Sequence, residues 1–301
     1  MKYFSIIVFL LMLISIPSVF AEGPDVYDVA ISLIGIGEIN KQVGSYELDF
    51  WYSIFSEEKD LIIDGPPPVD FMNGRDETFS SEYLASNISE QRVRGVFVSE
   101  MDFRDFPFEK ILLKVDLEPM TPYDTDHVVF RIDPASGIDS SATVPGWSVS
   151  EPTFSVGTKI YGNGEEYSRY SATYTIERSF IGTFLKIIFP VLIVLAISFL
   201  AYLIPEHFDV SAALTLLPLL AVVFLHIDTL DQLPALGYLT IFDKILLISY
   251  ALIANNIICT SREVRHFVYH GKEQSRQINK FHLTMSPVII ILMALPLFFF
   301  L

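Results

Sequence analysis

The spacing of hydrophobic positions changes near residue 178. Before that point, from Val26 to about Arg178, apolar and polar residues alternate with a period of two, which is typical of strands with one buried face. The pattern predicts strands at 28–34, 45–55, 94–98, 110–117, 127–132, 147–150 and 170–177. Turn residues separate them, as in Gly65-Pro-Pro-Pro and Gly162-Asn-Gly. Many short strands with this spacing predict an all-β, immunoglobulin-like sandwich.

After residue 178 the chain becomes apolar in long stretches. Four of them are long enough to span a bilayer as helices. They lie at about 184–204, 209–230, 237–260 and 281–301. The connection between the third and fourth stretch carries five basic residues, Arg262, Arg265, Lys272, Arg276 and Lys280. The positive-inside rule puts this connection in the cytoplasm, which leaves the N-terminal sandwich outside the cell or in the periplasm.

The first residues read as a secretory signal peptide at 1–21. Lys2 precedes an apolar run, and Ala21 supplies a small residue for cleavage. The alternative is a first membrane helix, for which the run is short. We therefore expect a sandwich domain at 22–178 and a four-helix membrane domain at 179–301 of a multi-pass protein of the cell membrane. Cys259 is the single cysteine, so the outer domain must hold together without an intrachain disulfide.

Charge is distributed as unevenly as hydrophobicity. The formal net charge is −16, and the segment 22–178 holds 29 carboxylates against 12 lysines and arginines. The chain has no glycine-rich phosphate loop, no metal-spaced cysteine and histidine set and no nucleophile motif. We therefore expect a protein that is not an enzyme, carries no resident cofactor and does not bind nucleic acid. Its expected partners are the lipid bilayer and small cations.

Three motifs resemble the pentameric ligand-gated ion channel family, and in particular its prokaryotic members, which lack the cysteines of the animal Cys-loop receptors. The segment 101–110, Met-Asp-Phe-Arg-Asp-Phe-Pro-Phe-Glu-Lys, is similar to the signature loop of the family. Arg178 followed by a span with Pro190 resembles its pre-helix arginine and first-helix proline, and the segment 233–243 resembles the linker and third-helix entry of its prokaryotic members. The count of four spans with a short inner loop is also similar to the family. The resemblance implies a homopentamer, in which each chain assembles with four identical subunits around a pore.

The resemblance also gives the second span a pore-lining face. Counted back from Leu233-Pro234, this face holds Asp209, Ala213, Leu217, Leu220, Phe224, Ile227 and Asp231. Five copies of each aspartate would form carboxylate rings that favour permeant cations, and apolar rings at Leu220 and Phe224 would close the pore by dewetting. The alternatives are that the aspartates cap helix ends and that the apolar residues pack against other helices.

The family couples its outer domain to the membrane where the two meet. Carried over by motif, the coupling residues are Glu38, Phe106, Pro107, Phe108, Glu109, Arg178 and Pro234. Arg178 in a junction of low dielectric needs carboxylate partners, for which Glu109 and Glu38 are the candidates. The same cluster could equally be a static brace.

Family ligands bind under an aromatic flap, which here is the turn around Gly162-Asn-Gly. The candidate ligand-binding residues are Phe50, Met72, Glu118, Tyr123, Tyr161, Glu165 and Tyr167. Aromatic faces and carboxylates suit an organic amine. The acidic outer domain makes protons or calcium bound between subunits competing stimuli, with calcium as a possible modulator rather than a cofactor.

Two further classes compete with a channel. One is a membrane-anchored sensor whose spans conduct no ions, although the acidic ends of the second span argue against it. The other is a transporter, for which four spans without inverted repeats are a poor fit.

Overall fold

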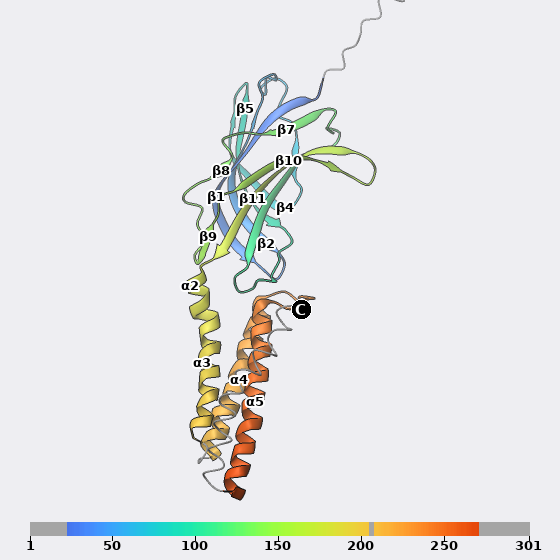
Figure 1. The fold of residues 1–301 in the computed structure, drawn as a ribbon. Helices are drawn as coiled ribbons and strands as arrows, with labels where there is room; N and C mark the ends of the chain where they lie inside the picture. The colour runs from blue at the N-terminus through green and yellow to red at the C-terminus, as the bar shows by residue number, and fades with distance from the viewer. Residues whose placement is uncertain (1–22, 205–207, 271–301) are drawn as a thin grey trace, which may run out of the picture.

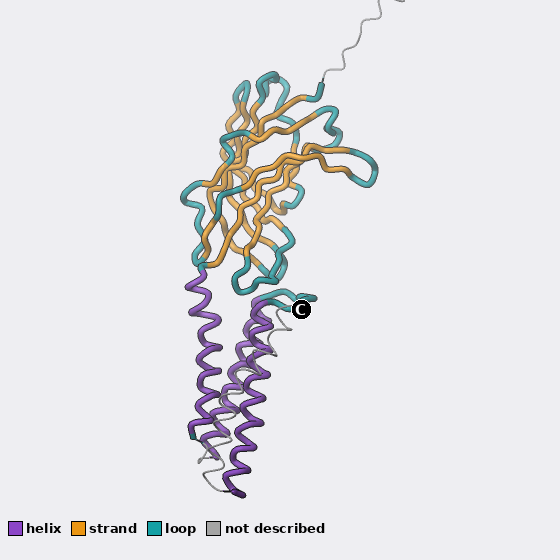
Figure 2. The backbone as a smooth tube through the Cα atoms, in the orientation of Figure 1, coloured by secondary structure: helices purple, strands orange, loops and turns teal. Residues whose placement is uncertain are grey.

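The computed structural model describes residues 23–204 and 208–270. Strands occupy one half of the molecule and helices the other, and the chain passes from one half to the other directly after Arg178 (Figure 1). Figure 2 shows the same division, with extended backbone above a bundle of helices that run side by side. The change of hydrophobic period near residue 178 therefore marks a change of architecture.

Eleven strands make up the described part of the N-terminal half. They are β1 Asp25–Asn40, β2 Ser45–Phe55, β3 Val69–Phe71, β4 Gly74–Leu84, β5 Ile88–Val98, β6 Lys110–Pro119, β7 Val128–Ile132, β8 Gly137–Ile138, β9 Trp147–Val149, β10 Thr153–Ile160 and β11 Glu166–Arg178. All seven predicted strands are present. The predictions missed β3, β4, β8 and β10, which are short or almost entirely exposed and so lack a clean buried alternation.

The strands form two sheets. One has the order β4-β5-β2-β1-β7, with β8 also paired to β1, and the other has the order β10-β11-β6-β3, with β9 also paired to β11. Pairing is antiparallel except where β1 meets β7 and β8. Antiparallel sheets of this kind bury one face each, so the region is β-sandwich-like, as predicted from the alternation.

The sandwich core shows why β2 folds as it does. Tyr46, Leu48 and Phe50 point inward and are buried, whereas Glu47 and Trp51 point outward. Phe50 packs against Phe97 and Phe71, which come from the same sheet and from the opposite sheet, respectively. Each fully buried side chain of this size contributes roughly 1.5–3 kcal/mol, and the aromatic ones dominate this core.

The helical half begins one residue after the sandwich ends. A continuous helical stretch consists of α2 Phe180–Thr183, a π-helical turn η1 Phe184–Ile188, α3 Phe189–Phe199 and a 3-10 turn η2 Leu200–Leu203. It is followed by α4 Phe208–Gln232 and α5 Ile241–His270. The π-helical turn ends two residues before Pro190, a residue that cannot donate a backbone hydrogen bond.

Three helices in the described part of the chain are long and apolar enough to cross a membrane, namely Phe180–Tyr202, Asp209–Gln232 and Ile241–Tyr269. They pack on one another through a second apolar cluster that includes Val191, Val222 and Leu246. These helices correspond to the first three predicted spans. The predicted fourth span, 281–301, and the predicted signal peptide, 1–21, lie outside the described residues.

Candidate functional site

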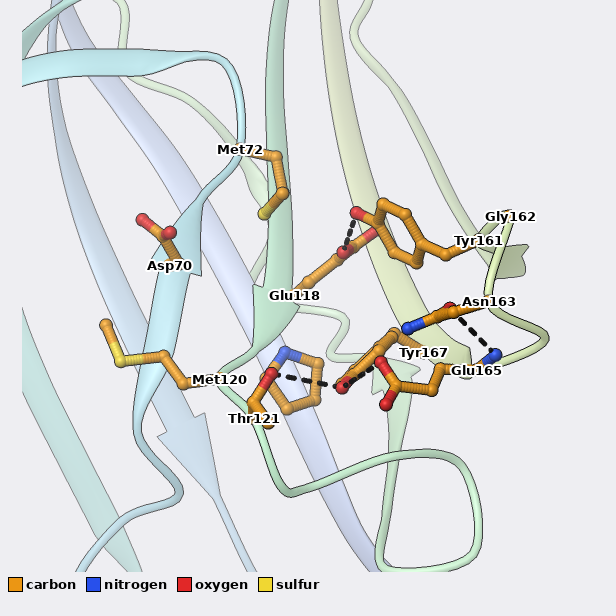
Figure 3. Close-up of a pocket in the computed structure, with 11 residues that line it drawn as sticks. Asp70, Met72, Glu118, Met120, Thr121, Tyr161, Gly162, Asn163, Glu165 and Tyr167 are labelled. Atoms are coloured by element: carbon orange, nitrogen blue, oxygen red, sulfur yellow. Dashed lines mark hydrogen bonds between the residues drawn. The ribbon is translucent and has the colours of Figure 1, made fainter.

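The candidate ligand site contains a cavity of about 650 Å³ at one end of the sheet β10-β11-β6-β3. Figure 3 shows it between the end of β6 and the turn that joins β10 to β11. Its lining residues are Asp70, Met72, Glu118, Pro119, Met120, Thr121, Tyr161, Gly162, Asn163, Glu165 and Tyr167. The volume falls in the range of small-molecule sites, and the lining mixes apolar, aromatic and acidic groups.

Glu118 anchors one wall of this cavity. It is buried, and it accepts hydrogen bonds from the Tyr161 hydroxyl at 2.7 Å and from the Nε of Arg169. Burial, together with the hydrogen bond to Glu118, raises the pKa of the Tyr161 hydroxyl above its ordinary value. Tyr161 therefore stays protonated and donating at neutral pH, and the charge of Glu118 is balanced by Arg169.

The flap is held in place by tyrosine contacts. The rings of Tyr161 and Tyr167 meet edge to face, with centroids 5.7 Å apart. The Tyr167 hydroxyl lies 3.1 Å from the Thr121 hydroxyl and donates to Glu165 at 3.2 Å (Figure 3). At the tip, Gly164 has φ +87°, which a residue with a side chain adopts only with strain. These contacts fix an aromatic wall with the exposed carboxylate of Glu165 beside it.

The structure brings five of the seven predicted ligand residues together in this cavity: Met72, Glu118, Tyr161, Glu165 and Tyr167. Tyr123 is exposed and does not line it. Phe50 is placed wrongly by the sequence prediction, because its side chain is fully buried in the sandwich core. Its neighbour Trp51 is the β2 aromatic that reaches the surface, since successive side chains on a strand point to opposite faces.

A second feature is the outward face of α4. All seven predicted pore residues are exposed, including Asp209 and Ala213 at one end and Asp231 at the other. At 3.6 residues per turn they fall within an arc of roughly 80°. Val222 and Thr229, on the opposite side, are buried against the bundle. Among the described residues of one copy, no segment packs on this face of α4, which has an aspartate near each end.

The apolar part of that face is pronounced. Leu217, Leu220, Phe224 and Ile227 are each at least half exposed. These four side chains therefore do not pack against other helices within the described part of one chain, which was the alternative to pore lining. His226 lies beside this face, and its Nδ1 is 3.3 Å from the Tyr250 hydroxyl of α5.

A third feature is the junction between sandwich and helices. The segment 101–110 lies on top of α5: the backbone N–H of Phe242 donates to the carbonyl of Phe106, and the rings of these residues meet edge to face with centroids 6.1 Å apart. Phe108 stacks on Phe180 at 5.1 Å, and Pro107 is buried. Phe106 shares an apolar cluster with Leu233, the neighbour of the half-buried Pro234.

The electrostatic centre of this junction is Glu109, which is fully buried. Arg178 donates its Nε to Glu109 at 3.1 Å, the pair that the sequence predicted. Glu38 is wrongly placed in this cluster, because β1 continues to Asn40 and leaves Glu38 exposed on the strand without an ion pair among the described residues. The turn instead contributes Lys41, which pairs with Glu109.

Sequence reasoning missed several residues of these sites. Lys41 and Trp147 at the junction, and Asp70 and Arg169 around the cavity, were not predicted. The signal that could have found Arg169 is its position on β11, two residues beyond Tyr167 on the same face. No family model and no curated protein matches this chain with significant similarity.

Proposed function

We propose that the chain is one subunit of a pentameric, cation-conducting ion channel that an external stimulus opens. The observation that supports this most is the unpartnered face of α4, on which seven residues chosen for pore lining are all exposed. A helix with this face needs either lipid or further copies of the chain against it. Aspartates near both ends suit an aqueous path better than a lipid-facing surface.

In five-fold assembly the Asp209 and Asp231 carboxylates form rings at the two mouths of the pore. Such rings concentrate cations and repel anions. Between them, the rings of Leu220 and Phe224 form a hydrophobic constriction that excludes water when narrow. Selectivity and closure then reside in different parts of the same helix face.

The stimulus acts on the outer domain, which lies outside the cell membrane in this proposal. The cavity beside Tyr161 and Tyr167 suits a compact organic cation. Glu118 is already balanced by Arg169, whereas Glu165 accepts a hydrogen bond from Tyr167 but has no cationic partner among the described residues. Calcium would have to bind between copies, since the described residues of one chain contain no group of three or more His, Cys, Asp or Glu placed to hold a metal ion. Protons are the third candidate.

The test is single-channel recording of the purified full-length protein in planar bilayers under acid, calcium and tetramethylammonium in turn. Unitary currents that carry Na⁺ in preference to Cl⁻ are expected, and native mass spectrometry should give five chains. Asp209→Lys should move the reversal potential towards that of Cl⁻, whereas Asp102→Lys on the exposed loop should not. A protein that binds a stimulus but never conducts would instead be a membrane-anchored sensor.

A further inference from the structure

Four side chains form a small cluster between the sandwich and the helices, which we name the junction cluster: Lys41, Glu109, Trp147 and Arg178. Lys41 comes from the turn between β1 and β2, Glu109 immediately precedes β6, Trp147 begins β9 and Arg178 ends β11. Both cations lie over the Trp147 ring, Lys41 at 5.2 Å and Arg178 at 4.9 Å from its centroid. Contacts of this kind are attractive, and more so when partly shielded from water.

The charges of the cluster do not balance. Lys41 and Arg178 both bond to the same oxygen of Glu109, Oε1. The other oxygen, Oε2, is buried and has no hydrogen-bond partner among the described residues. Burial, with the nearby Arg178 charge acting in the same direction, lowers the pKa of the Lys41 amine even though Glu109 opposes this. Two cations thus crowd one oxygen while its neighbour lacks a donor, which is a costly arrangement.

An alternative arrangement is within reach of the same groups. Arg178 bonds to Glu109 through Nε alone. A guanidinium is a planar fork that can bond to both oxygens of one carboxylate, whereas an ammonium cannot match that geometry. If Lys41 withdrew, Arg178 could therefore bond to Oε1 and Oε2 together and satisfy the oxygen that now lacks a donor.

Withdrawal of Lys41 would alter contacts that the β1–β2 turn makes with the helices. The next residue, Gln42, donates its side-chain amide to the backbone carbonyl of Asp231 at the outer end of α4. Lys41 also lies over the ring of Phe106, at 5.5 Å, and Phe106 packs on Phe242 of α5. Arg178 is the last strand residue before α2. One exchange of partners on Glu109 therefore reaches all three described membrane-spanning stretches.

We propose that the junction cluster is a two-state coupling device in which Lys41 and Arg178 compete for Glu109, with Trp147 as the positioning residue that keeps both cations within reach. In the shared state, which the structure shows, Lys41 holds the β1–β2 turn against the cluster. In the fork state, Arg178 takes both oxygens and the turn is released together with its contact to α4. The link to opening rests on the proposed function, whereas the exchange itself does not.

A double-mutant cycle on the unfolding midpoint tests the exchange of partners on Glu109, and it requires no measurement of ion current. In the full-length protein, Lys41→Met should lower the unfolding midpoint only slightly, because Arg178 can take over both oxygens. In an Arg178→Lys background the same change should cost about 2–4 °C more, since a lysine cannot form the fork. Equal losses in both backgrounds would overturn the proposal.

Controls separate this effect from a general loss of fold. Lys59→Met removes a half-buried lysine that pairs with Asp25 far from the junction, and its effect should be the same in both backgrounds. Lys41→Arg should restore most of the wild-type midpoint. Trp147→Phe keeps a ring and should retain part of the non-additivity, whereas Trp147→Leu should abolish it.

Single-channel recording tests whether the exchange is coupled to channel opening. Lys41→Met should change the ratio of open to closed time by about five- to a hundredfold, while unitary conductance and reversal potential stay fixed. The effect should shrink in the Arg178→Lys background. If gating is unchanged while the stability cycle is non-additive, then the partner exchange occurs but only braces the junction. That result would overturn the claim that the cluster couples the outer domain to the helices. Absence of current from the wild-type protein would refute the proposed function, and the stability cycle would still decide the exchange.

Discussion

The side-chain amide of Gln42 donates a hydrogen bond to the backbone carbonyl of Asp231 over 2.9 Å. Two segments 189 residues apart in the sequence thereby meet: the turn between the first two strands and the last turn of α4. Because the acceptor is a backbone atom, the Asp231 carboxylate takes no part in the bond. The structural and the electrostatic roles of this position can therefore be separated by mutation.

Asp231→Asn removes the charge and leaves the carbonyl in place. We expect an unchanged unfolding midpoint but a lower unitary cation conductance, with the loss largest near 10 mM salt and small near 1 M, where the Debye length is only about 3 Å. Gln42→Ala should do the reverse, lowering the midpoint without altering conductance. A salt-independent loss in Asp231→Asn would argue against a charged ring at the outer mouth.

The buried hydroxyl of Tyr52 has no hydrogen-bond partner among the described residues. Tyr52→Phe removes this unsatisfied group and should stabilise the sandwich by about 1 kcal/mol, or roughly 2–4 °C in the unfolding midpoint. Tyr46→Phe is the matched control. Its hydroxyl bonds to the backbone carbonyl and N–H of Lys114, so this change should destabilise. Tryptophan emission follows both variants, since Trp51 and Trp147 both lie in the sandwich.

The contribution of Asp49 to folding stability should be lost at acid pH. The hydrogen bond from Arg92, opposed by partial burial and assisted by Arg94, lowers the pKa of Asp49 below its ordinary value of 3.8. A carboxyl group with a lower pKa in the folded state stabilises fully above its unfolded pKa, and this contribution is lost as pH falls through the folded pKa. The ion pair of Asp49 with Arg92 is partly exposed, so solvent screening keeps its contribution to stability small.

We therefore expect Asp49→Asn to lower the unfolding midpoint at pH 6, and the difference from wild type to shrink below pH 3.8. Asp102→Asn, whose partner Arg104 is largely exposed, should show little difference at either pH. A constant penalty across this range would mean that Asp49 acts through packing rather than charge.

Two carboxylates of the cavity should respond differently to neutralisation. Glu118→Gln leaves Arg169 without its buried partner and should lower the unfolding midpoint. Glu165→Gln removes an exposed carboxylate and should leave the midpoint unchanged, but weaken tetramethylammonium binding about two- to fivefold. Calorimetric titration of the full-length protein measures the second effect. Equal affinity in wild type and Glu165→Gln would exclude this carboxylate from cation binding.

Sequence pattern and structure agree where one physical signal dominates. The alternation of β2 and the apolar lengths of the helices are such signals, because burial on one face and the thickness of a bilayer fix them directly. The seven residues on α4 were placed by the family resemblance, and at 3.6 residues per turn they share one face of the helix. By contrast, β4 is exposed along nearly its whole length, so its sequence carries no alternation to read.

The errors arise from backbone details that the pattern does not encode. Phe50 and Trp51 are adjacent aromatic residues, and which of them faces the core depends on the register of β2 against its neighbours. The motif places Glu38 in the turn after the first strand, but β1 continues to Asn40, so the turn supplies Lys41 instead. The pairing of Arg169 with Glu118 joins strands 51 positions apart, and the sequence gives no direct measure of that proximity.

The length of α5 sets a boundary for its surroundings. Its 30 residues extend for about 45 Å, whereas the hydrocarbon core of a typical bilayer is about 30 Å thick. Asp243 near its start and Arg262, which is exposed, are 19 positions apart, or about 28 Å along the axis. The distance between these two charges is therefore close to the thickness of the hydrocarbon core that α5 can span. A thicker membrane would have to thin around the helix, or the helix would have to pull one charge inward.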